Sequence, residues 1–238
     1  MTLSLHTALG PLPLLDWLAL ALYFAAWAGY AHWAGRRAQQ GLSLLATTNR
    51  WRREWMLQTT RRDNRIVDAA IAQNLSASPA FFASTSILVV GGLLAALAST
   101  DKASGLVREL PFATPTSLPV FDLKLAVLTG MFVFAFFRFT WSIRQYSFGV
   151  ILVGAAPDAA AFGDEAARTG FANRAGRVMG MAAETFNDGL RAYYLSFAVV
   201  AWFFSAWAFM ATTAFVVLVL YRREFHSDVL DALREPAP

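Results

Sequence analysis

Residues 79–100 read PAFFASTSILVVGGLLAALAST and contain no charged side chain. An α-helix needs about 20 apolar residues to cross a hydrocarbon core about 30 Å thick, so this stretch is long enough to span a membrane. Three more apolar stretches lie at residues 14–34, 123–143 and 192–220. Lipid offers no partner to backbone amides, and barrel strands would alternate in polarity, so these segments are predicted to be helices. The predicted fold class is all-α, an integral membrane protein with four transmembrane helices.

The composition agrees with a membrane protein. Hydrophobic residues make up 57% of the 238 residues and charged residues only 15%, which is more apolar than a typical soluble domain. The net charge of +4 is interpreted as membrane topology and not as nucleic-acid binding, because loop arginines orient transmembrane helices. The sequence has no cysteine, which excludes disulfides and thiolate metal sites.

Histidine positions and catalytic motifs give no indication of a cofactor. The histidines His6, His32 and His226 are too far apart in the sequence to pair on one helix as ligands of a metal or a haem. No zinc-protease, nucleophile-elbow, phosphate-loop or dinucleotide motif occurs in the sequence. The chain is therefore predicted to need no cofactor and not to be an enzyme.

Basic residues are concentrated in two connectors, at residues 35–78 and 144–191. Because lysine and arginine favour the cytoplasmic side, both connectors are predicted to be cytoplasmic and both chain termini to lie outside. The tail at residues 221–238 begins with Arg222 and Arg223, which disagrees with this topology.

A second topology therefore stays open, in which a re-entrant segment at residues 148–156 reverses the later half of the chain. In either case residues 1–238 are interpreted as one membrane domain. Its predicted location is the bacterial inner membrane.

Apolar side chains at three- and four-residue spacing predict that both connectors are helical extensions of the spans. In the first connector, the spacing from Trp51 to Gln73 predicts an amphipathic helix that leads into the second span. Its tryptophans and arginines suit the headgroups of anionic lipids. In the second connector, a stripe beginning at Phe171 predicts a helix that runs without a break into the fourth span. Gly176 and Gly180 would let another helix approach it closely.

Prolines predict where three of the spans begin. Ser78 followed by Pro79 suits an N-cap and a first helical position, since the missing proline amide would be unpaired there anyway. Pro13 and Pro119 are predicted to begin the first and third spans in the same way.

Arg138 lies deep in the third predicted span, among phenylalanines. At 1.5 Å per residue it sits about 22 Å from the start of that span, so snorkelling to the cytoplasmic headgroups is the favoured interpretation. Cation–π contacts with neighbouring rings, or a carboxylate from another helix, are the alternatives. The full set of polar residues in or near the spans that are candidates for a pore or a polar network is Arg62, Arg65, Asn74, Ser84, Ser86, Arg138, Arg144, Glu184, Asn187 and Arg191.

Several segments together carry a resemblance to a known family. They are the run from Arg61 to Ile66 with Asn74 and Leu75, the run from Phe81 to Ser86, the run from Arg138 to Gly149, and the residues Phe186, Asn187, Gly189, Leu190, Arg191, Tyr193 and Tyr194. In these segments the chain resembles bacterial and plant membrane proteins grouped as domain of unknown function 599. The resemblance implies four helices in a membrane and supplies no catalytic or binding residue.

Two functional hypotheses follow from the charge pattern. Arginines cluster toward the predicted cytoplasmic side, and rings of arginine favour anions, so the first hypothesis is a homo-oligomeric pore or transporter for small anions. The second is a non-catalytic structural or assembly subunit that packs against a membrane partner through its aromatic helices. The predicted partners are membrane lipids, anionic on the cytoplasmic side, and further copies of the chain, but not nucleic acid.

Overall fold

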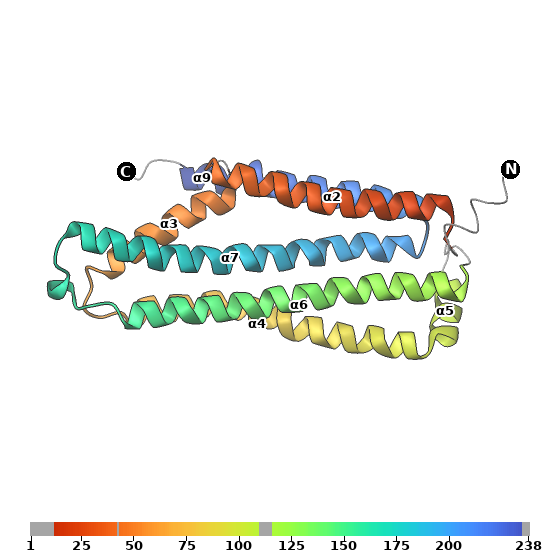
Figure 1. Ribbon diagram of the computed structural model, residues 1–238, viewed down its shortest axis with the longest axis horizontal. Coiled ribbons are helices and arrows are strands. Elements are labelled where there is room, and N and C mark those ends of the chain that lie inside the picture. Colours follow the sequence, from red (N-terminus) through yellow and green to blue (C-terminus); the bar gives the residue numbers. More distant parts are fainter. Residues whose placement is uncertain (1–11, 42, 110–115, 235–238) are drawn as a thin grey trace. The chain divides into compact units, whose positions relative to one another are not determined.

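The computed structural model describes residues 12–41, 43–109 and 116–234 (Figure 1). No strand occurs in these ranges. The elements are α2 (Leu14–Gln39), α3 (Leu44–Thr59), α4 (Ile66–Ala98), α5 (Thr100–Arg108), α6 (Leu118–Gly154), a short 3-10 turn η1 (Ala159–Ala161), α7 (Glu165–Trp202), α8 (Ala206–Phe225) and α9 (Asp228–Arg234).

Four helical segments of the described chain are long and apolar enough to cross a membrane. They are Leu14–Ala38, Ile66–Ala98, Leu118–Gly154 and Ala206–Arg234. The prediction of an all-α protein with four such helices is therefore confirmed. α6 is continuous over residues 148–154, so it leaves no place there for the re-entrant segment.

The fourth span differs from its prediction. Residues 192–220 are not one helix, because α7 ends at Trp202 and a turn at residues 203–205 precedes α8. The Ser205 hydroxyl accepts a hydrogen bond from the backbone N–H of Ala208 at 3.0 Å, which caps the start of α8. The Trp202 ring stacks on Phe209 across the turn, with ring centroids 5.0 Å apart. Two of the three turn residues, Phe203 and Phe204, are apolar, so hydropathy alone did not mark the turn.

The start of the second span and the helix before it also differ from the sequence-based prediction. Pro79 lies inside α4, which begins at Ile66, so Ser78 and Pro79 do not start the second span. The predicted amphipathic helix from Trp51 to Gln73 is divided by a turn between α3 and α4. The Asn64 side chain accepts a hydrogen bond from the Ile66 N–H at 3.0 Å in this turn.

The chain forms two compact units, each built from three segments. Unit 1 consists of Met1–Trp33, Ser86–Phe134 and Arg191–Tyr221. Unit 2 consists of Ala34–Thr85, Ala135–Leu190 and Arg222–Pro238.

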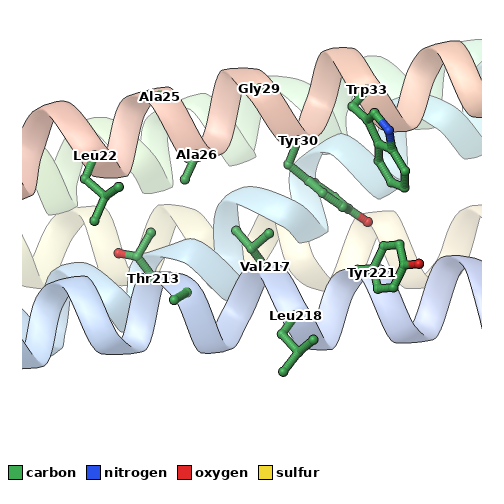
Figure 2. A pocket seen from close by; sticks show the side chains of 11 residues that line it. Leu22, Ala25, Ala26, Gly29, Tyr30, Trp33, Thr213, Val217, Leu218 and Tyr221 are labelled. Carbon is green, nitrogen blue, oxygen red and sulfur yellow. The ribbon is translucent and has the colours of Figure 1, made fainter.

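The core of unit 1 is built around Tyr23, which is fully buried. Its hydroxyl donates to the Leu195 carbonyl of α7 at 3.3 Å, and its ring centroid lies 5.0 Å from that of Phe209 on α8. A groove of about 620 Å³ opens between α2 and α8 in this unit (Figure 2).

The core of unit 2 includes the close approach of α3 to α7. A Cβ on Gly176 would lie 2.8 Å from the Cα of Arg53, and a Cβ on Gly180 would lie 3.1 Å from the Asn49 side chain. The two glycines of α7 thus admit the backbone of α3, so the prediction that they allow another helix to approach is confirmed. Met56 of α3 packs into the same core and is fully buried.

The C-terminal segment belongs to unit 2 and contacts the first connector. The Trp51 indole of α3 donates to the Leu233 carbonyl of α9 at 3.2 Å, and the Leu45 N–H donates to Glu224 at 3.2 Å. Glu224 and Leu233 therefore lie beside the first connector within unit 2, which disagrees with the topology that put the C-terminal tail on the opposite side and agrees with the open alternative in which the later half is reversed. The turn between α7 and α8 reverses the direction of the chain once more than the sequence-based topology allowed. The basic residue Arg222 in the last turn of α8 therefore no longer disagrees with the placement of the basic connectors.

Changing Gly176→Ala should lower the stability of unit 2 by about 1–3 kcal/mol, because the added methyl group overlaps the Arg53 backbone. The matched control is Gly170→Ala on the same helix, where the nearest atom, on Arg174, lies 4.0 Å away. That control should be neutral or stabilising, since alanine favours a helix by about 1 kcal/mol over glycine. Thermal unfolding of the purified protein measures both changes, and equal unfolding temperatures would contradict the proposed contact.

Candidate functional site

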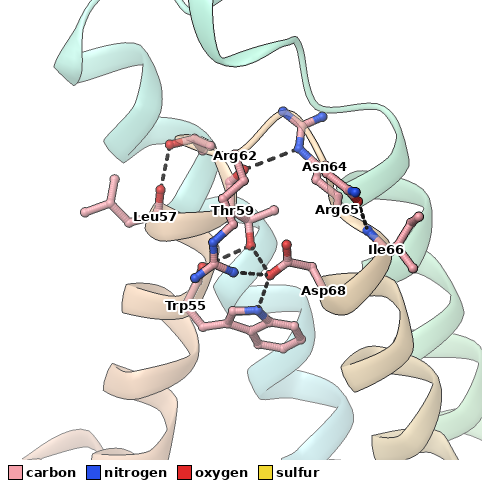
Figure 3. Close-up of polar contacts among 9 residues, drawn as sticks. Trp55, Leu57, Thr59, Arg62, Asn64, Arg65, Ile66 and Asp68 are labelled. Atoms are coloured by element: carbon pink, nitrogen blue, oxygen red, sulfur yellow. Dashed lines mark hydrogen bonds and ion pairs between the residues drawn. The ribbon is translucent and has the colours of Figure 1, made fainter.

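A buried carboxylate organises the turn between α3 and α4 (Figure 3). The Asp68 side chain is fully buried. Its Oδ1 accepts from the Trp55 indole at 2.7 Å, the Thr59 hydroxyl at 3.0 Å and the Arg62 guanidinium at 2.9 Å. Its Oδ2 is buried and has no hydrogen-bond partner among the described residues. Arg62 thus forms an ion pair with Asp68, because a buried carboxylate is stable only when a partner compensates its charge.

Two further arginines join the turn between α3 and α4 to the connector between α6 and α7. Arg65 donates to the carbonyls of Ala156, at 2.6 Å, and Pro157. Arg168 donates to the Thr60 carbonyl at 2.6 Å and also to that of Ala159. Basic side chains favourably cap carbonyls at the C-terminal end of a helix, so Arg65 holds the end of α6 in unit 2.

Arg138 of α6 forms an ion pair with Asp188 of α7. Each of the two side chains is about one-third exposed, at 34% and 33%, and the Arg138 Nε is buried with no hydrogen-bond partner among the described residues. The favoured interpretation that Arg138 snorkels is therefore wrong. The alternative of a carboxylate from another helix is correct.

The remaining candidates in unit 2 lie along α4, α6 and α7. The Asn49 side chain donates to Glu184 at 3.0 Å and accepts from Arg52 at 2.7 Å. Burial lowers the pKa of the Arg52 guanidinium from its ordinary value, and the nearby Glu184 carboxylate opposes that shift. Asn74, Ser84 and Arg144 are exposed, and Asn187 is half-buried. The Arg144 guanidinium lies 5.9 Å from the centroid of the Phe148 ring.

Ser86 and Arg191 belong to unit 1. The hydroxyls of Ser86 and Tyr193 lie 3.0 Å apart and share a hydrogen bond between α4 and α7. The Arg191 guanidinium lies 5.8 Å from the centroid of the Tyr30 ring. The candidate residues are therefore divided between the two units. Several of them brace helices or turns, namely Arg62, Arg65, Arg138 and Ser86.

A buried lysine in unit 1 was not among the residues singled out from the sequence. Lys124 of α6 is only 2% exposed. Its ammonium group donates to the Trp202 carbonyl at 2.9 Å and lies 5.3 Å from the centroid of the Trp202 ring. An ionisable residue inside a transmembrane segment is costly and is by default a functional candidate. Lys124 is the second residue of the predicted span 123–143, a position where the sequence does not show whether a lysine is buried or reaches the headgroups.

Lys124 lines a cavity of about 390 Å³ at the beginning of α6. The same cavity is lined by the carboxylate-bearing Asp16 of α2 and the hydroxyl-bearing Ser117 and Ser205. Asp16 accepts a hydrogen bond from the Trp202 indole at 2.5 Å. The cavity thus combines a cation, an anion and hydroxyls, which is the mixture of a few polar groups in an apolar surround that small-molecule sites use.

Within the described ranges, no three side chains of His, Cys, Asp or Glu gather closely enough to hold a metal ion. The groups that a ligand would meet in the Lys124 cavity are the ammonium, carboxylate and hydroxyl groups of its lining.

Residues 18–229 match a family described as "Protein of unknown function, DUF599". This match covers most of the chain, so the chain belongs to this family, and the resemblance noted in the sequence is confirmed. The chain matches no curated protein and no solved structure. The family and the four apolar helices together make it a membrane protein of unknown activity.

Replacing Asp188→Leu should destabilise the protein by about 2 kcal/mol, because the Arg138 guanidinium loses its partner in a poorly hydrated position. Arg138→Met should have a similar cost, since it leaves the Asp188 carboxylate alone. The double variant should recover most of the loss, because no unpaired charge remains. Unfolding of the four proteins of this cycle measures the coupling, and additive losses would show that the pair is not coupled.

Proposed function

We propose that this member of the family is a homo-oligomeric pore or transporter for small anions in the bacterial inner membrane, and that Lys124 binds the anion. The observation that supports the proposal is the burial of this ammonium group on a cavity at the end of a membrane-spanning helix. At 1.5 Å per residue, Lys124 lies about 9 Å along α6 from its first residue, a depth that a solute can reach from the membrane surface.

The neighbours of Lys124 suit transient binding. Asp16 balances the ammonium charge in the empty cavity, which lowers the cost of keeping a charge within a span. An entering anion competes with Asp16 for the ammonium group and gains donors from the hydroxyls of Ser117 and Ser205. Binding is then favourable but weak, and conduction needs a site that releases its ion as readily as it takes it up.

In this proposal the arginines do not line the anion path, although their clustering in the sequence suggested that they would. Arg62 and Arg138 have carboxylate partners, and Arg65 donates to helix-end carbonyls. Such engaged groups brace the protein and do not line a path. Exposed arginines in unit 2, among them Arg144, raise the local concentration of anions and hold anionic lipid headgroups at the cytoplasmic face.

A second candidate is the non-catalytic structural or assembly subunit. Its support is the set of large apolar side chains that the single chain leaves exposed on α7 and α8, with Phe197 at 62%, Trp207 at 68% and Phe215 at 64%. Lipid or a partner protein covers such side chains in a membrane. A partner that co-purifies in fixed stoichiometry from native membranes favours this candidate, and its absence favours the pore.

The mass of the protein extracted directly into lipid nanodiscs tests the assembly. Native mass spectrometry should give a closed homo-oligomer with a single number of copies. The same measurement on Arg144→Gln, which alters only an exposed side chain, serves as the control and should give the same number. A monomer in the nanodisc contradicts the homo-oligomer and leaves any path within one chain.

Lys124→Met should abolish most of the anion flux into liposomes, because methionine keeps the length of the side chain and removes its charge. A tenfold or larger loss is expected, since a hydrogen bond to a charged group contributes about 1.5–3 kcal/mol. The matched control is Lys102→Met, at an exposed position of α5 in the same unit. Equal flux for both variants, with equal unfolding temperatures, would exclude Lys124 from the path.

A further inference from the structure

The groove between α2 and α8 is a large apolar feature of unit 1, at about 620 Å³. The small residues Ala25 and Gly29 of α2 line it, together with Leu22 and Leu218 (Figure 2). The hydroxyl of Thr213, which also lines the groove, is bonded to its own helix at the Phe209 carbonyl at 2.7 Å. This part of the groove therefore offers hydrocarbon surface to whatever occupies it.

The two ends of the groove differ in character. Tyr30, Trp33 and Tyr221 gather at one end, and Leu22 and Thr213 lie at the other (Figure 2). Tyrosine and tryptophan prefer the interface between hydrocarbon and headgroups, where an apolar ring and a polar tip are both accommodated.

Each helix also becomes basic just beyond this aromatic end. The last turn of α2 contains Arg36 and Arg37, and the last turn of α8 contains Arg222 and Arg223. Basic residues at the end of a span lie at the headgroup layer. The aromatic end of the groove thus lies near the headgroups, and the aliphatic end points into the hydrocarbon.

A positive charge lies behind the aromatic end. The Arg191 guanidinium of α7 packs against the Tyr30 ring, 5.8 Å from its centroid. The guanidinium charge of Arg191 at this end of the groove favours a negatively charged headgroup.

We propose that the α2–α8 groove binds one acyl chain of an anionic phospholipid, with the phosphate at the end formed by Tyr30, Trp33 and Tyr221. The groove volume falls in the range of about 300–1,000 Å³ that is usual for small-ligand sites. The groove has an aliphatic end and an aromatic end near basic residues, which matches the acyl chain and the charged headgroup of a phospholipid. This proposal is independent of the anion pathway at Lys124.

A helix from a second copy fits the groove less well than an acyl chain. A helix is a rod about 10 Å across and needs an unobstructed groove along its length, whereas an acyl chain is narrower and flexible. The Tyr30 ring also projects between α2 and α8 (Figure 2), which leaves space for a flexible chain beside it.

Native mass spectrometry of the protein from nanodiscs with equal amounts of phosphatidylglycerol and phosphatidylcholine tests the proposal. The wild-type chain should retain one phosphatidylglycerol per copy. Gly29→Leu should fill the groove and lose this lipid, and a Cβ at Gly29 meets no atom within 4 Å, so the variant has room to fold. Gly92→Leu is the matched control, because a Cβ there also meets nothing within 4 Å and the residue lies on α4, away from the groove. Ala214→Leu, from the α8 side, should repeat the loss.

The charge of the headgroup is tested separately. Arg191→Gln should reduce the preference for phosphatidylglycerol over phosphatidylcholine by about fivefold while a lipid is still retained. An unchanged preference overturns the assignment of the anionic headgroup. A lipid that persists in both Gly29→Leu and Ala214→Leu overturns the groove as its site. A fall in the number of copies in these variants, with the lipid retained, overturns the proposal in favour of a second copy in the groove.

Discussion

Lipid hydrocarbon does not solvate charge, so an ionised group that this chain buries among its helices needs a protein partner. Arg138 has Asp188, and Lys124 has the Trp202 carbonyl with Asp16 in the same cavity. At the start of α4, the Asp68 carboxylate collects three donors. Apart from Arg62, which lies in the turn before α4, each of these partners comes from a different helix than the group it satisfies. Satisfying the charges therefore also fixes which helices are neighbours within each unit.

The turns of unit 2 show the same constraint applied to the backbone. Helix ends leave carbonyls without intrahelical partners, and arginines supply the missing donors at the end of α6. These arginines sit in a region whose excess of positive charge is also expected from membrane topology. The arginines of unit 2 therefore both orient the protein in the membrane and brace its helix ends. A high density of arginine does not by itself indicate an anion path.

The two units differ in what they offer a ligand. Unit 2 is basic and tightly cross-linked by side chains, with α3 held against α7 at Gly176. Unit 1 contains two features with space for a ligand among the described residues, the Lys124 cavity and the α2–α8 groove. Because the first is polar and the second apolar, a solute and a lipid acyl chain can be bound in unit 1 without competing for the same surface.

The sequence by itself determined the membrane-spanning character, the helical class and three of the four spans, because a long apolar stretch without alternating polarity satisfies its backbone in lipid as a helix. It also indicated the close approach at Gly176, since a small residue has no side chain to obstruct a neighbour. Only the tertiary structure showed the break after Trp202, because a short turn that contains Phe203 and Phe204 leaves the hydropathy of the segment almost unchanged. The partner of Arg138 and the cavity at Lys124 likewise came from the structure, since pairing between helices depends on which faces meet, and the spacing of residues along one chain does not specify that.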